Sequence, residues 1–399
     1  MASLQARHSR SCRLKRPWTT FAEATKQQGC TCTPLYHVVL RSSGRLIREP
    51  VGHNRKEAER ALDARRGDIA RRTYRVLEDI PFDKWADQWL ESFTGKANSV
   101  RSYSSTIAYA KHAFGRAKVR DLTATDVRHF LDLIRADNRK RRSRKRRPED
   151  GPPPEVSPAT LAKHLRQLGA CLQAAISEGY AHENPVRLLH KTARPKVAKS
   201  RPVYYTDDEL ARLWPELACR PVMLALCKTA VATGLRSGEL AALRWTDVDL
   251  LNRELHVART FVDGIGEQTT KSNEPRTVDL TPQAAALLER WYAESGDDGL
   301  VFEREQGGHL SSSYVTRQVL YPALKRAGIP RMGERGRKRD FHSFRHSFAR
   351  IALEGGAEIV WVQRQLGHSS ITLTVDTYGS WARTAEKSQA EKLAGVFPL

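Results

Sequence analysis

A basic stretch that contains two prolines, residues 187–202, divides the chain into parts with different hydrophobic patterns. Prolines interrupt helices, so we interpret this stretch as an interdomain linker. Before it, helix-type spacing predicts an all-helical domain over residues 78–190. After it, a β-rich region at residues 248–280 lies between helical patterns, which predicts a mixed α+β domain over residues 200–399.

The helical pattern is clearest at the start of the first of these domains. Phe82, Trp85, Ala86 and Trp89 follow the i, i+3, i+4, i+7 spacing of one helix face. Further helices are expected over residues 99–114, 123–134 and 157–178.

The first 75 residues predict a small ββα unit. Residues 35–41 and 46–51 are rich in strand-forming side chains and are joined by a turn. A capping-box pattern that begins at Asn54 predicts a helix after them. We place this unit at residues 30–75 and expect residues 1–29, which are basic and lack clear periodicity, to be a loose lead-in. The fold class expected for the whole chain is mostly α with small β-sheets.

The charge of the chain indicates a polyanionic partner. It has 67 Lys and Arg against 45 Asp and Glu, a formal net charge of +22, and residues 1–75 hold 17 of these basic residues against 6 acidic ones. Lys and Arg placed on phosphates release condensed counterions, which favours nucleic-acid binding. Charge alone leaves open a ribosomal type of protein or a merely basic soluble one. The hydrophobic content of 40% excludes a disordered basic tail.

A run within the helical domain carries eight basic residues in nine. Such a run is normally a solvated loop. In a helical domain it is also a natural arm for phosphate contacts. The candidate DNA-binding residues are Arg139, Lys140, Arg141, Arg142, Arg144, Lys145, Arg146 and Arg147.

The six cysteines show no disulfide framework. Cys30 and Cys32 form a C-x-C pair with no second pair nearby, so we expect neither a metal nor a disulfide scaffold. An 18-residue apolar run and a signal-peptide pattern are also missing from the sequence. We therefore expect a protein of the reducing cytoplasm, with no cofactor and no membrane contact.

Two arginines and two histidines precede a tyrosine near the end of the chain, and the set is Arg236, His342, Arg345, His368 and Tyr378. A phenol that attacks a phosphodiester develops negative charge on the non-bridging oxygens, and preorganised cations stabilise that charge. Arg345 can hold a phosphate through two parallel N–H bonds, which a lysine cannot do. The set favours an enzyme that breaks and rejoins DNA without a metal.

Each of these residues alone has a simpler explanation. Arg236 has the alternative of a helix cap or a surface salt bridge, and Glu239, three residues later, could hold its guanidinium. His368 stands where a helix is expected to end and could be only a cap. Tyr378 by itself would be an ordinary core or surface aromatic residue. We expect His346, next to Arg345, to be packed or exposed rather than catalytic.

The leaving 5′-oxygen needs a proton, and a lysine whose pKa is lowered by neighbouring cations is a suitable donor. Lys271 is the only lysine in the β-rich region. We expect it on the turn of a hairpin whose second strand is residues 276–280. A lysine on a turn is ordinarily just exposed, but here we predict that Lys271 is the general acid.

The order of these residues resembles the tyrosine recombinase (phage integrase) family. The motifs that carry the resemblance are specific as a set. They are Thr233-Gly-Leu-Arg-Ser-Gly-Glu-Leu240, His342-Ser-Phe-Arg-His-Ser-Phe348, Leu366-Gly-His-Ser-Ser370 and Asp376-Thr-Tyr378. Residues 78–190 are similar to the core-binding domain of the family, residues 30–75 to an arm-type DNA-binding domain, and residues 200–399 to the catalytic domain.

The resemblance implies a clamp around DNA and a covalent intermediate. Tyr378 would attack the scissile phosphate and leave a 3′-phosphotyrosine with a free 5′-hydroxyl. The 5′-hydroxyl of the partner strand would reverse this step through a Holliday junction in a homotetramer, without ATP or metal. The other implied roles are phosphate binding by Arg236 and Arg345, assistance by His342 and His368, and protonation by Lys271.

The expected function is integration and excision of a mobile element at double-stranded attachment sites. Whether an excisionase and a DNA-bending host factor set the direction stays open. A type IB topoisomerase uses the same chemistry but relaxes supercoils as a monomer, and a catalytically inactive protein would only bind DNA. The ββα unit and a short amphipathic helix expected at residues 382–397 favour an integrase, because such tails in the family dock onto a neighbouring subunit.

Overall fold

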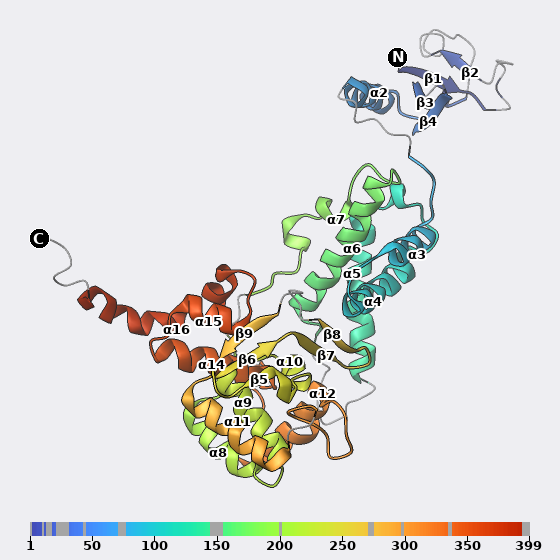
Figure 1. Ribbon diagram of the computed structural model, residues 1–399. Coiled ribbons are helices and arrows are strands. Elements are labelled where there is room, and N and C mark those ends of the chain that lie inside the picture. Colours follow the sequence, from blue (N-terminus) through green and yellow to red (C-terminus); the bar gives the residue numbers. More distant parts are fainter. Residues whose placement is uncertain are drawn as a thin grey trace, which may run out of the picture. The chain divides into compact units, whose positions relative to one another are not determined.

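The computed structural model divides into two units, Met1–Val197 and Ala198–Leu399, which are drawn in Figure 1. The boundary falls inside the predicted linker, residues 187–202. The start of that stretch belongs to the first unit, because Leu189 is buried in its core and Arg194 donates to the carbonyl oxygen of Leu189. The structure describes residues 2–9, 12, 18–20, 32–42, 45–70, 77–143, 155–198, 202–269, 275–296, 299–333 and 337–392.

The first unit begins with an antiparallel sheet and a helix that packs on it. The elements are β1 (Ser3–Arg7), β2 (Trp18–Thr20), β3 (Leu35–Ser42), β4 (Arg45–Gly52) and α2 (Arg55–Ala70). The strands are ordered β2-β1-β3-β4. Leu4 and Ala6 alternate with exposed neighbours along β1 and form a core with Val38 and Leu40. The predicted strands and helix are present, but the loose lead-in expected over residues 1–29 is wrong for β1 and β2.

Helices surround a second core in the first unit. They are α3 (Phe82–Ser92), α4 (Ala97–Phe114), α5 (Ala124–Ser143), α6 (Pro158–Ser177) and α7 (Pro185–Leu188), with 3-10 turns η1 (Val119–Asp121) and η3 (Lys191–Ala193). The face of α3 predicted from its spacing is buried, namely Phe82, Trp85, Ala86 and Trp89. The side chain of Ser157 caps α6 by accepting a hydrogen bond from a backbone N–H. The helices expected here are confirmed.

The second unit is formed largely by helices. They are α8 (Asp207–Leu217), α9 (Pro221–Thr233), α10 (Ser237–Ala241), α11 (Pro282–Ser295), α12 (Ser312–Tyr314), α13 (Tyr321–Arg326), α14 (His342–Glu354), α15 (Ile359–Leu366) and α16 (Ile371–Lys392), with turns η4 (Trp245–Asp247) and η5 (Val315–Leu320). A capping box formed by Thr206 and Glu209 begins α8. α9 and α15 end at Gly234 and Gly367, whose φ values of 68° and 61° let the chain turn sharply.

Small antiparallel sheets follow α10 in the chain. Their strands are β5 (Val248–Asp249), β6 (Glu254–Val257), β7 (Arg259–Val262), β8 (Gly266–Thr269) and β9 (Arg276–Asp279). Leu255 and Val278 lie opposite each other on β6 and β9 and are both buried in the core. The β-rich region predicted at residues 248–280 is confirmed. The expected hairpin before residues 276–280 is wrong in the described strands, because β8 pairs with β7 whereas β9 pairs with β6. Lys271 lies outside the described residues.

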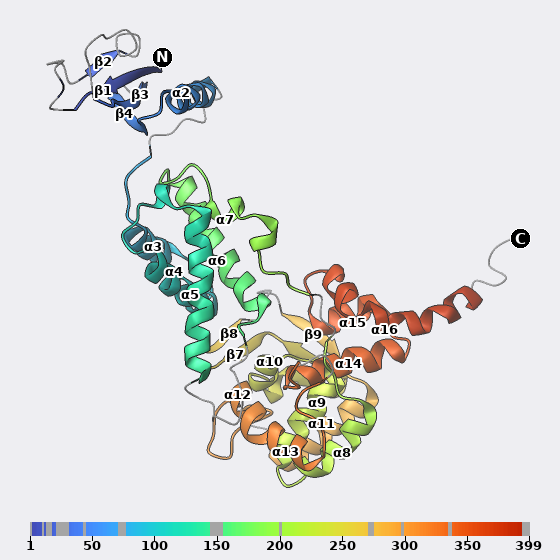
Figure 2. The same ribbon diagram turned by 180° about the vertical axis from the view of Figure 1, so that it is seen from behind.

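α14, α15 and α16 pack together on one side of the second unit in both views (Figures 1 and 2). Their shared core includes Phe348, Val362, Leu366 and Tyr378. α16 continues without interruption past Tyr378, whereas the sequence predicts a separate helix at residues 382–397. Within the described part of the chain, no helix has the length and apolarity needed to cross a membrane.

Candidate active site

Arg345 lies where two helix ends meet. One terminal nitrogen donates to the carbonyl oxygen of Gly234 at 2.7 Å, and the other donates to that of Leu366 at 2.6 Å. These carbonyls belong to the C-terminal ends of α9 and α15, where a cation is favoured by the helix dipoles. Burial and the charge of Arg236 lower the pKa of Arg345 to about 9. The guanidinium, only 2% exposed, therefore stays charged at neutral pH.

Arg236 stands at the N-terminus of α10, as the sequence predicts, and Glu239 holds it. Its Nη1 donates to Glu239 Oε1 at 2.8 Å and its Nη2 donates to the carbonyl oxygen of Gly367 at 3.0 Å. Arg236 thereby contacts the residue before His368, so the first and third sequence motifs meet in space. Its side chain remains partly exposed.

A further arginine, Arg276 on β9, completes this network. It donates to both carboxylate oxygens of Glu239, at 3.0 and 2.8 Å, and a Cβ built on Gly367 would lie 2.7 Å from its Nε. Burial by itself would raise the pKa of Glu239, but the hydrogen bonds and charge of Arg276 and the charge of Arg236 lower it to about 2. Two guanidinium groups thus bind one carboxylate, and Arg345 is near enough for their charges to act on it, which leaves excess positive charge for an anionic ligand.

Tyr378 is enclosed by aromatic rings. Its side chain is 1% exposed, and its phenolic oxygen lies 2.8 Å from Nδ1 of His346. The rings of His368 and Trp381 lie nearly parallel to the ring of Tyr378, with centroids 6.2 and 5.3 Å from its centroid. Burial raises the pKa of Tyr378, although the charges of Arg345 and Arg236 partly oppose that shift. The phenol is therefore protonated at neutral pH and must lose its proton to react.

His346, for which the sequence predicts no catalytic role, contacts the candidate nucleophile. It is packed, as expected, but the group that it packs against is the phenol of Tyr378. The signal was its spacing from His342: residues four apart share a helix face, and the two rings lie 4.8 Å apart. Burial, followed by the charges of His342 and Arg345, lowers the pKa of His346 to about 3. Its ring is therefore neutral and can accept a proton.

The two remaining histidines flank this group. His368 follows Gly367, and its Nδ1 lies 2.9 Å from the hydroxyl of Thr374. Burial, followed by the charges of Arg345 and Arg236, lowers the pKa of His368 to about 4. His342 is the first residue of α14 and is exposed.

The structure thus brings five of the candidate residues into one cluster, which consists of Arg236, His342, Arg345, His368 and Tyr378. Of the basic run in the other unit, Arg139 and Lys140 are exposed on α5. The side chains of the run's other members, residues 141–147, lie outside the described residues, as does Lys271.

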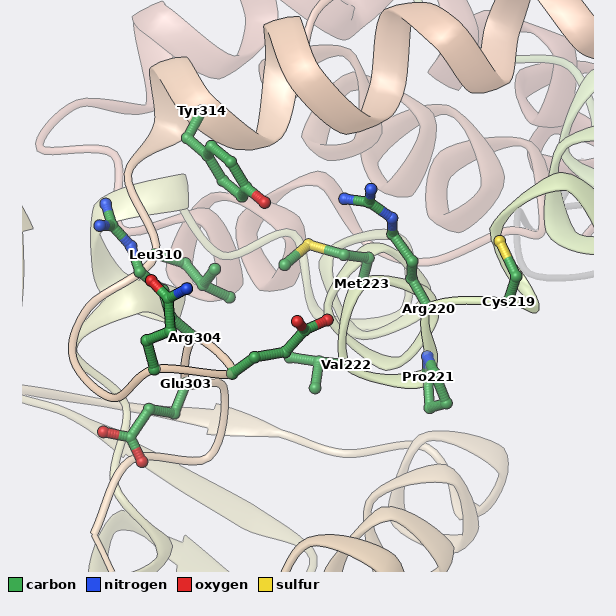
Figure 3. A pocket seen from close by; sticks show the side chains of 11 residues that line it. Cys219, Arg220, Pro221, Val222, Met223, Glu303, Arg304, Leu310 and Tyr314 are labelled. Carbon is green, nitrogen blue, oxygen red and sulfur yellow. The ribbon is translucent and has the colours of Figure 1, made fainter.

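A cavity of about 200 Å³ in the second unit lies away from this cluster (Figure 3). It is lined by Arg220, Met223, Arg304 and Tyr314, among others, at the N-terminal end of α9. The cluster lies at the C-terminal end of the same 13-residue helix, about 20 Å away at ~1.5 Å per residue. The cavity therefore has no part in the candidate active site.

Comparisons with known proteins agree with the motifs. Residues 208–383 match the phage integrase family. Tyrosine recombinase XerC of Halalkalibacterium halodurans is 30% identical over 315 residues, which are 72% of this chain and 91% of that protein. The ICEBs1 integrase of Bacillus subtilis is 26% identical over 57% of this chain and 63% of that protein. A XerC-like tyrosine recombinase of Caldanaerobacter subterraneus is 28% identical over 56% of this chain. The chain thus spans 63% of the length of the ICEBs1 integrase and 62% of the length of the XerC-like recombinase.

Solved structures show the same fold. The Tn1549 transposon integrase in complex with transposon right end DNA has a TM-score of 0.62 at 17% identity, covering 79% of this chain and all of that one. A lambda integrase tetramer bound to a Holliday junction has a TM-score of 0.57 at 20% identity, covering 85% of this chain and 91% of that one. The motifs, the clustering of their residues and the match to nearly the whole of one XerC together show that the chain belongs to the phage integrase family of tyrosine recombinases.

Proposed function

We propose that this protein is a site-specific DNA recombinase that integrates and excises a mobile element. The observation that carries the proposal is the placement of the Tyr378 phenol between a neutral imidazole, His346, and the positive charge of Arg236 and Arg345. The relatives include the integrase of ICEBs1, and the similar structures include integrases in complex with DNA. We propose that it acts in the cytoplasm, at the nucleoid, where such a DNA substrate lies.

In the first step the phenolic oxygen of Tyr378 forms a bond to the scissile phosphorus, and the bond from phosphorus to the 5′-oxygen breaks. The phenolic proton passes to Nδ1 of His346. The charge of a bound phosphodiester offsets the nearby guanidinium groups and raises the pKa of His346, so that the ring becomes a better base when DNA is present. Lys271 protonates the leaving 5′-oxygen.

Arg236 and Arg345 bind the non-bridging oxygens, and His342 and His368 add hydrogen bonds to them. Each terminal nitrogen of Arg345 carries a second N–H besides the one that it donates to a carbonyl oxygen. The carbonyl contacts hold the guanidinium in place before the DNA arrives, so little reorganisation is needed as charge develops. Neither ATP nor metal is needed, because the phosphotyrosine conserves the energy of the phosphodiester.

Religation by the 5′-hydroxyl of a partner strand reverses the first step and exchanges the strands. We propose that a homotetramer carries out two such exchanges through a Holliday junction, as four protomers assemble on two attachment sites. An excisionase and a DNA-bending host factor are the further partners that would set the direction.

A nicked suicide substrate tests the reaction. The DNA carries a candidate attachment core, taken from the junction of the mobile element, and the leaving strand is lost after cleavage. We expect a covalent protein–DNA adduct that survives denaturant and forms in the presence of a chelator. The adduct should be absent from Tyr378→Phe and normal in Tyr292→Phe, which changes an exposed tyrosine on α11.

Two outcomes would contradict the proposal. If the protein binds the cognate DNA but never forms the adduct, it acts only as a DNA-binding protein. If the adduct forms equally on arbitrary duplexes and supercoils are relaxed, the activity is that of a type IB topoisomerase.

A further inference from the structure

Three potential metal ligands lie together in the N-terminal sheet unit, far along the chain from the catalytic residues. The Nδ1 atom of His8 is 3.2 Å from Sγ of Cys32 and 3.8 Å from Sγ of Cys12. The three ligand atoms all lie within 4.8 Å of one another. Among the described residues, these three form the group of His, Cys, Asp or Glu side chains whose ligand atoms lie close enough together to hold one metal ion.

These distances fit a tetrahedral zinc ion. With Zn–N of about 2.0 Å and Zn–S of about 2.3 Å, a tetrahedral angle separates nitrogen from sulfur by about 3.5 Å. The two observed separations, 3.2 and 3.8 Å, lie on either side of that value. Two sulfurs and one imidazole form a donor set that selects zinc over magnesium or calcium, which prefer oxygen ligands.

The sheet register brings the ligands to the same place. On β1, Arg7 is paired with Trp18 of β2 on one side and with Leu35 of β3 on the other. The end of β1, the start of β2 and the start of β3 therefore meet at one end of the sheet. His8 follows β1 directly, Cys12 lies in the β1–β2 connection and Cys32 shortly precedes β3, so all three ligands lie at this end.

The burial and the hydrogen bonding of His8 suit a ligand. His8 continues the alternation of Leu4 and Ala6 along β1, which places its ring on the core side of the sheet. The residue is 7% exposed. Its Nε2 lies 3.0 Å from the hydroxyl of Thr19, itself 5% exposed. A hydrogen bond from Nε2 to this hydroxyl would fix the tautomer and leave Nδ1 as the nitrogen that faces the sulfurs.

The unit also has a physical need for a cross-link. Its core is small: among the described residues, three alanines and four larger side chains are buried in it, the latter being Leu4, Tyr36, Val38 and Leu40. Domains of this size commonly require a metal or disulfides in addition to their apolar core. A metal that joins the ends of β1 and β3 would fix the connection to β2, which is a strand of only three residues.

We propose that His8, Cys12 and Cys32 bind a structural zinc ion that stabilises the N-terminal sheet unit. The expectation from the sequence that the C-x-C pair holds no metal overlooked His8 and Cys12, because the sheet, rather than a second C-x-C pair, supplies the other ligands. Cys30 lies outside the described residues, and the proposal rests on the other three. It is independent of the proposed recombination chemistry.

The test measures the metal content of the full chain, without an affinity tag, purified under reducing conditions and passed over a weak chelating resin. We expect about one zinc ion per chain by elemental analysis. His8→Ala, Cys12→Ser and Cys32→Ser should each lose most of it. Cys219→Ser, which changes an exposed cysteine in the other unit, should keep it. Zinc content below a tenth of an ion per wild-type chain, or equal content in all four variants, would overturn the proposal.

A variant could lose zinc because it fails to fold rather than because it lacks a ligand. Cobalt substitution in the wild-type protein avoids this ambiguity. In the wild-type protein, Co²⁺ in place of zinc should give the near-ultraviolet band of thiolate-to-cobalt charge transfer and the intense visible bands of a tetrahedral site. Weak bands of octahedral cobalt without the charge-transfer band would show that the cysteines do not bind the ion. A disulfide between Cys12 and Cys32 would give the same negative result and would also overturn the proposal.

Discussion

The phenolic oxygen of Tyr378 lies 2.8 Å from Nδ1 of His346, and both residues belong to the same catalytic unit. Tyr378, the proposed nucleophile, is therefore almost fully buried among residues of its own chain. His346 is neutral at physiological pH, but its pKa of about 3 makes it a weak base until a bound phosphodiester offsets the nearby positive charge. The pair is thus prepared for the first chemical step only when DNA is bound.

His346→Phe should slow formation of the covalent adduct by about 100-fold, because it removes a proton acceptor and leaves the ring volume in place. DNA affinity should change little. Single-turnover cleavage of the suicide substrate over a range of pH values measures the effect, and the acidic limb of the pH profile should change shape in the variant. His256→Asn, at an exposed histidine on β6, serves as the control. Equal rates for the two variants would show that His346 has no part in the reaction.

The stability of the catalytic unit should fall as the pH decreases below about 6.5. His346 and His368 have pKa values lowered to about 3 and 4, mainly by burial. The unfolded chain therefore binds more protons than the folded protein in this range, which favours unfolding. Each ring contributes at most about 1.4 kcal/mol per pH unit, and less where solvent screens it. His346→Asn should have a shallower pH dependence in urea unfolding between about pH 4.5 and 7.5. Parallel curves for the variant and wild type would contradict this.

Glu239→Gln should destabilise the catalytic unit by about 3 kcal/mol, because it leaves the charges of Arg236 and Arg276 partly buried without a counter-charge. The carboxylate is 3% exposed, and it accepts hydrogen bonds from both arginines. Thermal unfolding measures the loss. Glu289→Gln, at an exposed position of α11, should change the melting temperature little. A stable Glu239→Gln protein would mean that the arginines do not need this partner.

Gly234→Ala should destabilise the protein by about 3 kcal/mol through two separate effects. The residue has a φ of 68°, and an added Cβ would lie 2.5 Å from Phe348 and 2.9 Å from Leu366. Gly356→Ala isolates the backbone effect, because its φ is 89° and a Cβ there meets nothing within 4 Å. Unfolding free energies of the two variants should differ by the cost of overpacking, about 1–3 kcal/mol. Equal losses would show that the helices around Gly234 yield freely.

Replacing Arg139 and Lys140 by glutamine should weaken binding to all DNA sequences to the same extent. Both side chains are exposed on α5, at the start of the basic run. If they contact phosphates, the slope of log affinity against log salt should become shallower by about one for each residue lost. Fluorescence anisotropy at several salt concentrations measures the slope for cognate and arbitrary DNA. An unchanged slope would remove these two residues from the interface.

The parts of the site that the sequence predicts are those set by local spacing. Glu239 is three residues after Arg236 on a short helix, so its contact with that guanidinium follows from helix geometry. Arg276 is 37 residues away, and its contact with the same carboxylate depends on where β9 is placed beside β6. Pattern analysis cannot reach such a contact because it carries no information about the placement of distant elements.

Contacts between distant elements also explain two errors of the sequence prediction, namely the missed strands β1 and β2 and the separate helix expected at residues 382–397. β2 has only three residues, too few to show an alternation. Its pairing with β1 crosses a connection of ten residues, so the short alternation in β1 has no partner that the sequence pattern reveals. At the start of α16, the sequence Ile-Thr-Leu-Thr-Val is rich in β-branched residues, which disfavour helix formation. Packing of this segment against α14 and α15 outweighs that preference.

α16 carries Tyr378, the proposed nucleophile, in its first half and continues past it without interruption. From Tyr378 to Lys392 it continues for 14 residues, about 20 Å at ~1.5 Å per residue. A contact at its far end therefore acts on the same helix that carries the phenol beside Arg236 and Arg345. Reactivity in one protomer is in this way mechanically connected to whatever holds the end of its last helix.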